Sequence, residues 1–261
     1  MKILLTGHKG FIGSALFKAL SLNHKVTGID LQDGWDRDHL NNSQNLLTCE
    51  FPNIEFDLII HLAGKSGVRE SFTDPAGYWN NNVEASRRLF ERYPDTRILY
   101  ASSSSAYEPD LNPYAASKFV LEELAERYPD TLGMRFHTVY SDNCPRENMF
   151  FNRLRNGTLE YTTTHYRDFI HLLDLIDGIL ILINNPHVNG IIDIGSGNPI
   201  KIQTLAPELP VRLNTQGERN WTCANIEKMK RLGFKPKYSV EKFLTSNNLD
   251  NIIYINNGEK V

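Results

Sequence analysis

The sequence predicts an α/β protein built on a doubly wound parallel sheet, with a small C-terminal lobe. Short apolar runs alternate with longer segments of helical periodicity through the first half of its 261 residues. Strands that alternate with helices pair in parallel, and parallel strands need crossover helices on both faces of the sheet. A glycine-rich segment also follows the first apolar run, as is typical of the first strand-to-helix turn in these folds.

The elements of the first half are defined by apolar runs and by the residues that interrupt them. The expected strands are residues 2–6, 25–30, 57–62, 97–102 and 131–137. The expected helices are residues 11–22, 78–93 and 114–128. Pro94 and Pro129 directly follow the second and third helices, and each should end its helix because proline cannot continue one.

The pattern changes after about residue 140. A polar loop is expected first, and the elements expected after it are helices at 148–155, 172–184 and 225–232 and strands at 168–171 and 190–194. Gly233 is suited to end the last helix, since glycine readily adopts the left-handed conformation found there. We therefore expect residues 1–140 to form mainly the sheet domain and residues 141–261 mainly the small lobe, with some segments returning to the sheet.

Composition and charge exclude several classes of protein. Hydrophobic residues make up 41% and charged residues 23%, which is typical of a globular chain and not of a disordered or fibrous one. With 28 Lys and Arg against 31 Asp and Glu, no overall basic surface favours nucleic acid. The three cysteines lack the spacing of a metal site or disulfide framework. No apolar run reaches 18 residues and no signal peptide is recognised, so we expect a cytoplasmic protein without membrane contact.

The glycine-rich segment has the features of a dinucleotide-binding loop. Gly7 would permit the tight turn, Gly10 would let a diphosphate approach the backbone, and Gly13 would let helix and strand pack closely. Three spaced glycines alone can be merely a turn. Asp30, however, ends the second expected strand, where a carboxylate binds ribose hydroxyls and repels a 2′-phosphate. No arginine or lysine directly follows it, so the sequence favours NAD over NADP.

A tyrosine and a lysine are placed for proton transfer. Tyr114 and Lys118 are one turn apart on the same face of an expected helix. An ammonium beside a phenol favours the phenolate, which can serve as a base. Four serines, 102–105, lie where the strand 97–102 ends, the edge at which such sheets bind ligands. An exposed helix and a polar loop are the alternative interpretation, but the order of all these features favours an active site.

These motifs resemble those of the extended short-chain dehydrogenases/reductases, within the NAD-dependent nucleotide-sugar epimerase/dehydratase family. The resemblance covers nearly the whole chain. The segments that carry it are TGHKGFIG (6–13), HLAG (61–64), GVRES (67–71), NNV (81–83), SSSSAY (102–107), YAASK (114–118), RFHTVYS (135–141), RDFIHLLD (167–174) and LGFKP (232–236). It implies a Rossmann fold that binds NAD, a nucleotide-sugar substrate with a UDP-sugar favoured, and a homodimer formed through the helices 78–93 and 114–128.

The resemblance also implies roles for individual residues. Tyr114 would be the catalytic base, Lys118 its partner, and Ser103 the catalytic serine. The implied NAD contacts are Gly7, Gly10, Phe11, Ile12, Gly13, Asp30, Leu62, Ala63, Gly64, Asn82, Tyr114, Lys118 and Phe136. The implied substrate contacts are Ser103, Ser104, Tyr114, Thr138, Arg167 and Arg219. No metal is implied.

Several positions depart from the family pattern. Thr138 replaces an asparagine expected near the sugar diphosphate, and the arginine expected just before Gly217 is missing, so that Arg212 or Arg219 would have to replace it. Residues 48–50 lack the usual aspartate, and the helix expected between them and Asp57 is shortened or absent. These departures leave the identity of the sugar and the nucleotide open.

The residues after the fourth strand narrow the reaction. Family members that dehydrate carry an Asp-Glu pair where this chain has Ser104 and Ser105, and decarboxylases need a glutamate near Ser105. The resemblance therefore favours epimerisation at C4 through a transient 4-keto sugar. A nucleotide-sugar dehydrogenase or 4-keto reductase, and a non-catalytic dinucleotide-binding protein, stay open as alternatives.

Overall fold

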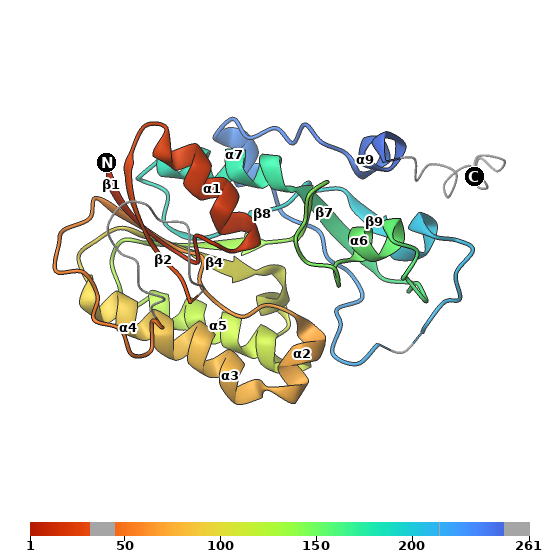
Figure 1. The fold of residues 1–261 in the computed structure, drawn as a ribbon, viewed down its shortest axis with the longest axis horizontal. Helices are drawn as coiled ribbons and strands as arrows, with labels where there is room; N and C mark the ends of the chain where they lie inside the picture. Colours follow the sequence, from red (N-terminus) through yellow and green to blue (C-terminus); the bar gives the residue numbers. More distant parts are fainter. Residues whose placement is uncertain (32–44, 214, 248–261) are drawn as a thin grey trace. The chain divides into compact units, whose positions relative to one another are not determined.

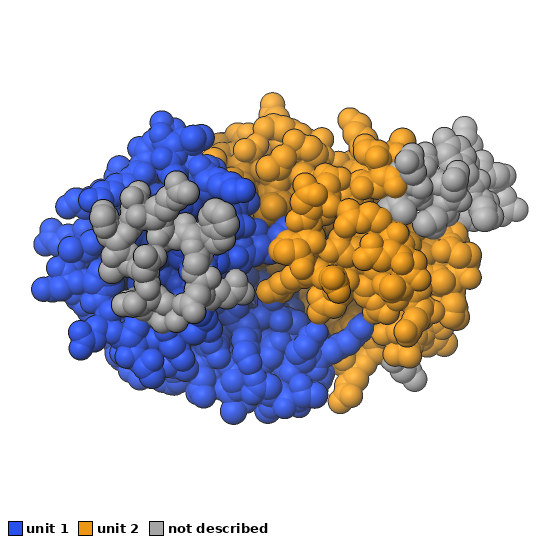
Figure 2. Space-filling view, in the orientation of Figure 1, with its two compact units in different colours: residues 1–135, 185–192 blue, residues 136–184, 193–261 orange. Residues whose placement is uncertain are grey.

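A computed structural model describes residues 1–31, 45–213 and 215–247. The chain divides into two compact units (Figure 2). The first comprises residues 1–135 and 185–192, and the second comprises residues 136–184 and 193–261. In the described part of the chain, no helix is both long enough and apolar enough to cross a membrane.

The main sheet has six strands and confirms the predicted doubly wound parallel architecture (Figure 1). In spatial order they are β2 (Lys25–Ile29), β1 (Lys2–Thr6), β3 (Leu58–His61), β4 (Ile98–Ser103), β5 (Thr131–Phe136) and β8 (Gly190–Ile194). β1 pairs in parallel with β2 and β3, and β3 pairs in parallel with β4. β8 is a segment from the second half of the sequence that returns to this sheet, as the sequence allowed.

Helices cover both faces of this sheet in the first unit. α1 (Phe11–Ser21) lies on one face, and α3 (Pro75–Trp79), α4 (Ala85–Arg92) and α5 (Pro113–Ala125) lie on the other (Figure 1). The core between the sheet and the second set of helices contains Leu4, Ile59, Leu89, Phe90 and Tyr100. The Asn112 side chain accepts a hydrogen bond from Ala115 N at 2.8 Å, so a cap and Pro113 together fix where α5 begins.

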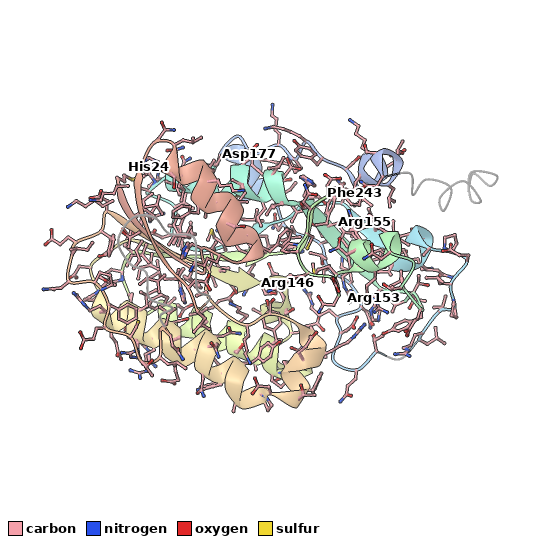
Figure 3. The ribbon with its side chains drawn as sticks, in the orientation of Figure 1. His24, Arg146, Arg153, Arg155, Asp177 and Phe243 are labelled. Atoms are coloured by element: carbon pink, nitrogen blue, oxygen red, sulfur yellow. The ribbon has the colours of Figure 1, made fainter. Side chains whose placement is uncertain are left out.

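The second unit is built around a smaller sheet and an aromatic core. Its strands are β6 (Thr138–Tyr140), β7 (Tyr166–His171) and β9 (Pro199–Lys201), and its helices are α6 (Phe150–Arg155), α7 (Leu172–Ile183), α8 (Glu227–Arg231) and α9 (Val240–Ser246). Phe243 of α9, labelled in Figure 3, contacts Phe151 of α6, and the ring centroids are 5.1 Å apart. Phe151 also contacts Phe169 of β7 at 5.0 Å, so the rings join helices and sheet.

The structure differs from the predicted elements in a few places. The expected helix 78–93 is three consecutive pieces, because a π-helical turn (Asn80–Glu84) lies between α3 and α4. α2 (Val68–Thr73), β6, β9, α9 and three short 3-10 turns (Ser104–Tyr107, Pro109–Leu111 and Ile202–Leu205) were not predicted, since their few residues show no clear period. Residues 45–57 contain turns and no helix, as expected from their short length.

Candidate active site

The glycine loop is packed so closely that Gly7 and Gly13 have no room for a side chain. Gly7 has φ of +74°, and a Cβ there would lie 2.7 Å from Ala63 N. A Cβ on Gly13 would lie 2.0 Å from Gly7 O, so the start of α1 rests on the loop itself. Both glycines are therefore required, one by conformation and contact and the other by contact alone.

Asp30 lies beside this loop. Its carboxylate Oδ2 accepts a hydrogen bond from Lys9 N at 2.9 Å, which joins the residue after β2 to the turn after β1. Gly10 is the N-cap of α1 and supplies no side-chain cap, an arrangement suited to an anion at the helix N-terminus. A tight turn with glycine at both ends, a helix N-terminus and an adjacent carboxylate together fit a dinucleotide.

A buried histidine joins the ends of the first and third strands. His61 Nδ1 lies 2.6 Å from Thr6 Oγ1, and His61 Nε2 lies 2.8 Å from Ser86 Oγ. Burial lowers the pKa of His61 to about 3, and the nearby Lys118 charge acts in the same direction, so the ring is neutral. Thr6 Oγ1 also accepts from Ala63 N at 3.3 Å. The ring thus helps to hold the segment 62–64 against the glycine loop, a role that the sequence did not reveal.

Asn82 ties the loop after β3 to α5. Its side chain is buried in the π-helical turn, where Oδ1 accepts from Lys65 N at 2.8 Å. Its Nδ2 donates to Lys65 O at 3.0 Å and to Ser117 Oγ at 2.9 Å. A Cβ on Gly64 would lie 2.7 Å from Asn82 Oδ1 and 3.5 Å from Lys118 Nζ. Three predicted site residues, Gly64, Asn82 and Lys118, are therefore brought together.

Tyr114 and Lys118 are held in the first two turns of α5. Lys118 is 5% exposed, and its Nζ donates to Ala101 O at 2.8 Å. Burial lowers the pKa of Lys118 to about 8, while the negative charge of Glu122 acts against this shift. The Tyr114 ring packs edge to face on Tyr78, with centroids 6.0 Å apart. The pair is thus placed on one helix face as its spacing predicts.

The four serines separate into different environments. Ser103 is buried at the end of β4, and its Oγ accepts from Ser105 N at 3.1 Å. Ser104 begins the 3-10 turn Ser104–Tyr107. Ser102 points elsewhere, since its Oγ donates to Glu122 Oε1 at 2.5 Å. Ser103 and Ser104 therefore lie at the strand end where the sequence placed them, while Ser102 belongs to a buried network that the sequence did not indicate.

Arg167 is the centre of a charged cluster in the second unit. Its Nη1 donates to Arg219 O at 2.7 Å, and its Nη2 lies 3.2 Å from Glu218 Oε2. Nη2 also lies 3.2 Å from His165 Nδ1, and burial together with the Arg167 charge lowers the pKa of that histidine. Two of the predicted substrate residues, Arg167 and Arg219, are therefore neighbours. The Glu218 pairing was missed because Glu218 lies 51 residues from Arg167 in the chain.

The aspartate beside Arg167 has a structural role. Asp168 is fully buried and accepts hydrogen bonds from Ser196 N at 2.7 Å, Gly197 N at 2.9 Å and Ala224 N at 2.8 Å. These hydrogen bonds hold the segments around residues 196–197 and 224 next to β7. Thr138 begins β6 opposite Phe169 of β7, and Phe136 is the buried last residue of β5.

Comparisons with known proteins identify the family of the chain. Residues 3–195 match the NAD dependent epimerase/dehydratase family. An uncharacterized UDP-glucose epimerase of Bacillus subtilis strain 168 is 30% identical, over 94% of this chain and 96% of its own. A UDP-glucuronate 4-epimerase of Thermodesulfobacterium geofontis is 28% identical, over 92% of this chain and 93% of its own. The structure of a UDP-glucuronic acid 4-epimerase from Bacillus cereus, in complex with UDP-glucuronic acid and NAD, is 25% identical with a TM-score of 0.80, covering 97% of this chain and 100% of that one. The chain belongs to the NAD dependent epimerase/dehydratase family.

Proposed function

We propose that this protein is an NAD-dependent nucleotide-sugar epimerase that inverts C4 of a UDP-sugar through a transient 4-keto sugar. The observation that carries the proposal is the placement of Tyr114 and Lys118 on α5, with the Lys118 ammonium bonded to the end of β4 just before the serines. The similarity to an uncharacterized UDP-glucose epimerase and to a UDP-glucuronate 4-epimerase, each over more than nine-tenths of the chain, supports the substrate class. A homodimer and a cytoplasmic location, both expected from the sequence, belong to the same proposal.

The first unit supplies the residues that would hold the cofactor. The glycine loop and the N-terminus of α1 suit the diphosphate, and Asp30 suits the adenosine ribose. Leu62, Ala63 and Gly64 continue the same surface, because Gly7 rests on the backbone of this segment. When bound, NAD accepts a hydride from the sugar carbon and later returns it.

The chain itself moves the proton. Tyr114 takes the proton of the C4 hydroxyl as that carbon is oxidised, and returns it as the 4-keto sugar is reduced. Lys118 lies one turn of α5 after Tyr114, and its ammonium would favour the phenolate that this step needs. The Ser103 hydroxyl hydrogen-bonds the same sugar oxygen and orients it.

The second unit supplies the groups for the nucleotide. The Arg167 guanidinium suits a diphosphate, with Arg219 and Thr138 as further contacts. Glu218 partly neutralises Arg167, so a bound diphosphate would share this guanidinium with a carboxylate. The pairing of Arg167 with Glu218 suggests that the diphosphate is bound more weakly than two arginines without a carboxylate partner would bind it.

The turn after Ser103 favours epimerisation over elimination. Residues 104–107 offer hydroxyls and no carboxylate, so this turn holds no acid to expel a hydroxyl group as water. The reactions that this turn is compatible with are oxidation and reduction at a single carbon of the sugar. A net reductase would use the same Tyr114 and Lys118, and the two reactions differ in whether the cofactor is regenerated on the enzyme.

Incubation of the purified protein with UDP-glucose and with UDP-glucuronic acid tests the proposal. The proposal expects interconversion of 4-epimers, separated by chromatography, without accumulation of NADH at 340 nm. Tightly bound NAD should also be released from the denatured protein and identified by mass. NADH that accumulates in proportion to product would instead identify a dehydrogenase, and a Tyr114→Phe sample serves as the inactive control.

A further inference from the structure

A buried carboxylate lies directly behind the proposed catalytic residues. Glu122 is 2% exposed and follows Lys118 by one turn of α5, so Tyr114, Lys118 and Glu122 share one helix face. Carboxylates are seldom so buried unless they are paired. The reaction proposed above makes no use of Glu122.

The Glu122 carboxylate binds residues from two neighbouring strands. The Ser102 hydroxyl of β4 donates to Oε1 at 2.5 Å. Arg135 of β5 donates from Nε to Oε1 at 2.8 Å and from Nη2 to Oε2 at 2.6 Å. A bidentate arginine pair of this kind fixes geometry as well as charge. One side chain therefore holds β4 and β5 against α5.

The same network reaches both sides of Ser103. Ser102 directly precedes Ser103 on β4. Tyr107 ends the 3-10 turn that follows Ser103, and its ring centroid lies 4.0 Å from the Arg135 guanidinium carbon. The backbone before and after the proposed catalytic serine is thus linked to Glu122.

Glu122 also acts on the Lys118 ammonium. Burial lowers the pKa of Lys118 to about 8, and Glu122 opposes this effect. The other titratable groups around these two are His61 from β3, Tyr100 from β4, Arg135 from β5, and Tyr114 and Glu126 on α5. His61 is neutral because its pKa is about 3, and burial raises the pKa of Tyr100, so that group is neutral too.

We propose that Glu122 is a positioning residue that keeps the Lys118 ammonium charged and fixes Ser103 through Ser102, Arg135 and Tyr107. This rests on the proposed roles of Tyr114, Lys118 and Ser103. Loss of the Glu122 charge would leave Arg135 without its paired carboxylate and would remove the negative charge that acts on the buried Lys118 ammonium.

The titration of Lys118 can be measured without turnover. The rate at which acetic anhydride acetylates Lys118, followed by mass spectrometry as a function of pH, gives the midpoint of its deprotonation. In Glu122→Gln, which keeps the shape but not the charge, this midpoint should fall by about one pH unit or more. In the double variant Glu122→Gln with Arg135→Gln, the Lys118 midpoint should fall less. The positive charge of Arg135, which would no longer be paired with a carboxylate, is removed in this variant as well. Ser102→Ala is the matched control: it removes one hydrogen bond to the same carboxylate and should leave the midpoint near that of the wild type.

The fall of kcat/KM at high pH should also move to lower pH. This shift should be largest in Glu122→Gln, smaller in the double variant and near zero in Ser102→Ala. A folded Glu122→Gln protein with an unchanged Lys118 midpoint would overturn the proposal. If that variant does not fold, a midpoint in the double variant at or above the wild-type value would overturn it as well. A wild-type protein that lacks epimerase activity while its Lys118 midpoint responds to Glu122→Gln would reject the proposed function and retain the coupling.

Discussion

Tyr114 is the residue on which the proposed chemistry depends most directly. We expect Tyr114→Phe to lower kcat by about 10²–10⁴-fold, because a positioned proton carrier typically contributes that much. NADH binding, followed by fluorescence, should stay nearly unchanged, since the ring contact with Tyr78 and the glycine loop are retained. Lys118→Met should lower both kcat and NADH affinity, because it removes a charge and an implied ribose contact. Near wild-type turnover in Tyr114→Phe would mean that another group carries the proton, with His137 and His165 the next candidates.

Asp30 determines the expected preference between the two nicotinamide cofactors. A 2′-phosphate placed beside this carboxylate would meet a like charge, which can cost several kcal/mol, or a factor of about 10² or more in affinity. NADH should therefore bind the wild-type protein much more tightly than NADPH in parallel fluorescence titrations. Asp30→Asn should reduce the difference between the affinities for NADH and NADPH. Tighter binding of NADPH to the wild type would contradict this role of Asp30.

His61 makes the stability of the chain depend on pH. Its pKa is about 3 in the folded protein, against about 6.5 when exposed, so below pH 6.5 the unfolded chain binds a proton that the folded one does not. Stability is therefore fully present above pH 6.5 and is lost as the pH falls towards 3. At pH 5 the loss from this one group is about 2 kcal/mol. Urea unfolding at pH 7 and pH 5 measures it, and a smaller loss in His61→Gln would assign it to this residue.

At the scale of the elements, the glycine loop illustrates how conformation and contact combine. Gly7→Ala would place a Cβ 2.7 Å from Ala63 N in a left-handed backbone. The left-handed conformation alone costs about 1–2 kcal/mol, and the contact adds to it. Gly157→Ala is the matched control, since Gly157 has φ of +66° but no atom within 4 Å of its Cβ. Thermal unfolding should show a clearly larger loss for Gly7→Ala, and equal losses would show that the contact does not matter.

The π-helical turn is an element-scale feature with a consequence for the site. The segment 78–93 was predicted as one helix, and the extra residue in the turn Asn80–Glu84 interrupts its regular period. Asn82 lies within that turn and bonds both to Lys65 and to Ser117 of α5. Periodicity alone could identify the helix but not this local change in its hydrogen bonding.

At the scale of the whole molecule, we expect a homodimer formed through the helices around α5. Trp79 of α3 is 44% exposed and Phe119 of α5 is 37% exposed, both large apolar side chains on the helices implied by the family resemblance. Light scattering at micromolar concentration should give twice the chain mass. Phe119→Glu should yield the monomer, whereas Leu22→Glu, at an exposed leucine just after α1, should not. A monomeric wild type would contradict the expectation.

The sequence by itself determined the features that depend on neighbours in the chain. Apolar periods located the main strands and helices, the glycine spacing identified the loop, and the four-residue spacing placed Tyr114 and Lys118 on one helix face, because helix geometry fixes that relation. Only the tertiary structure decided which distant groups meet. Glu122 with Arg135, Asp168 with Ala224, and Arg167 with Glu218 are pairs whose partners lie on different segments of the chain. The order of strands in the sheets brings such partners together, and no local pattern encodes that order.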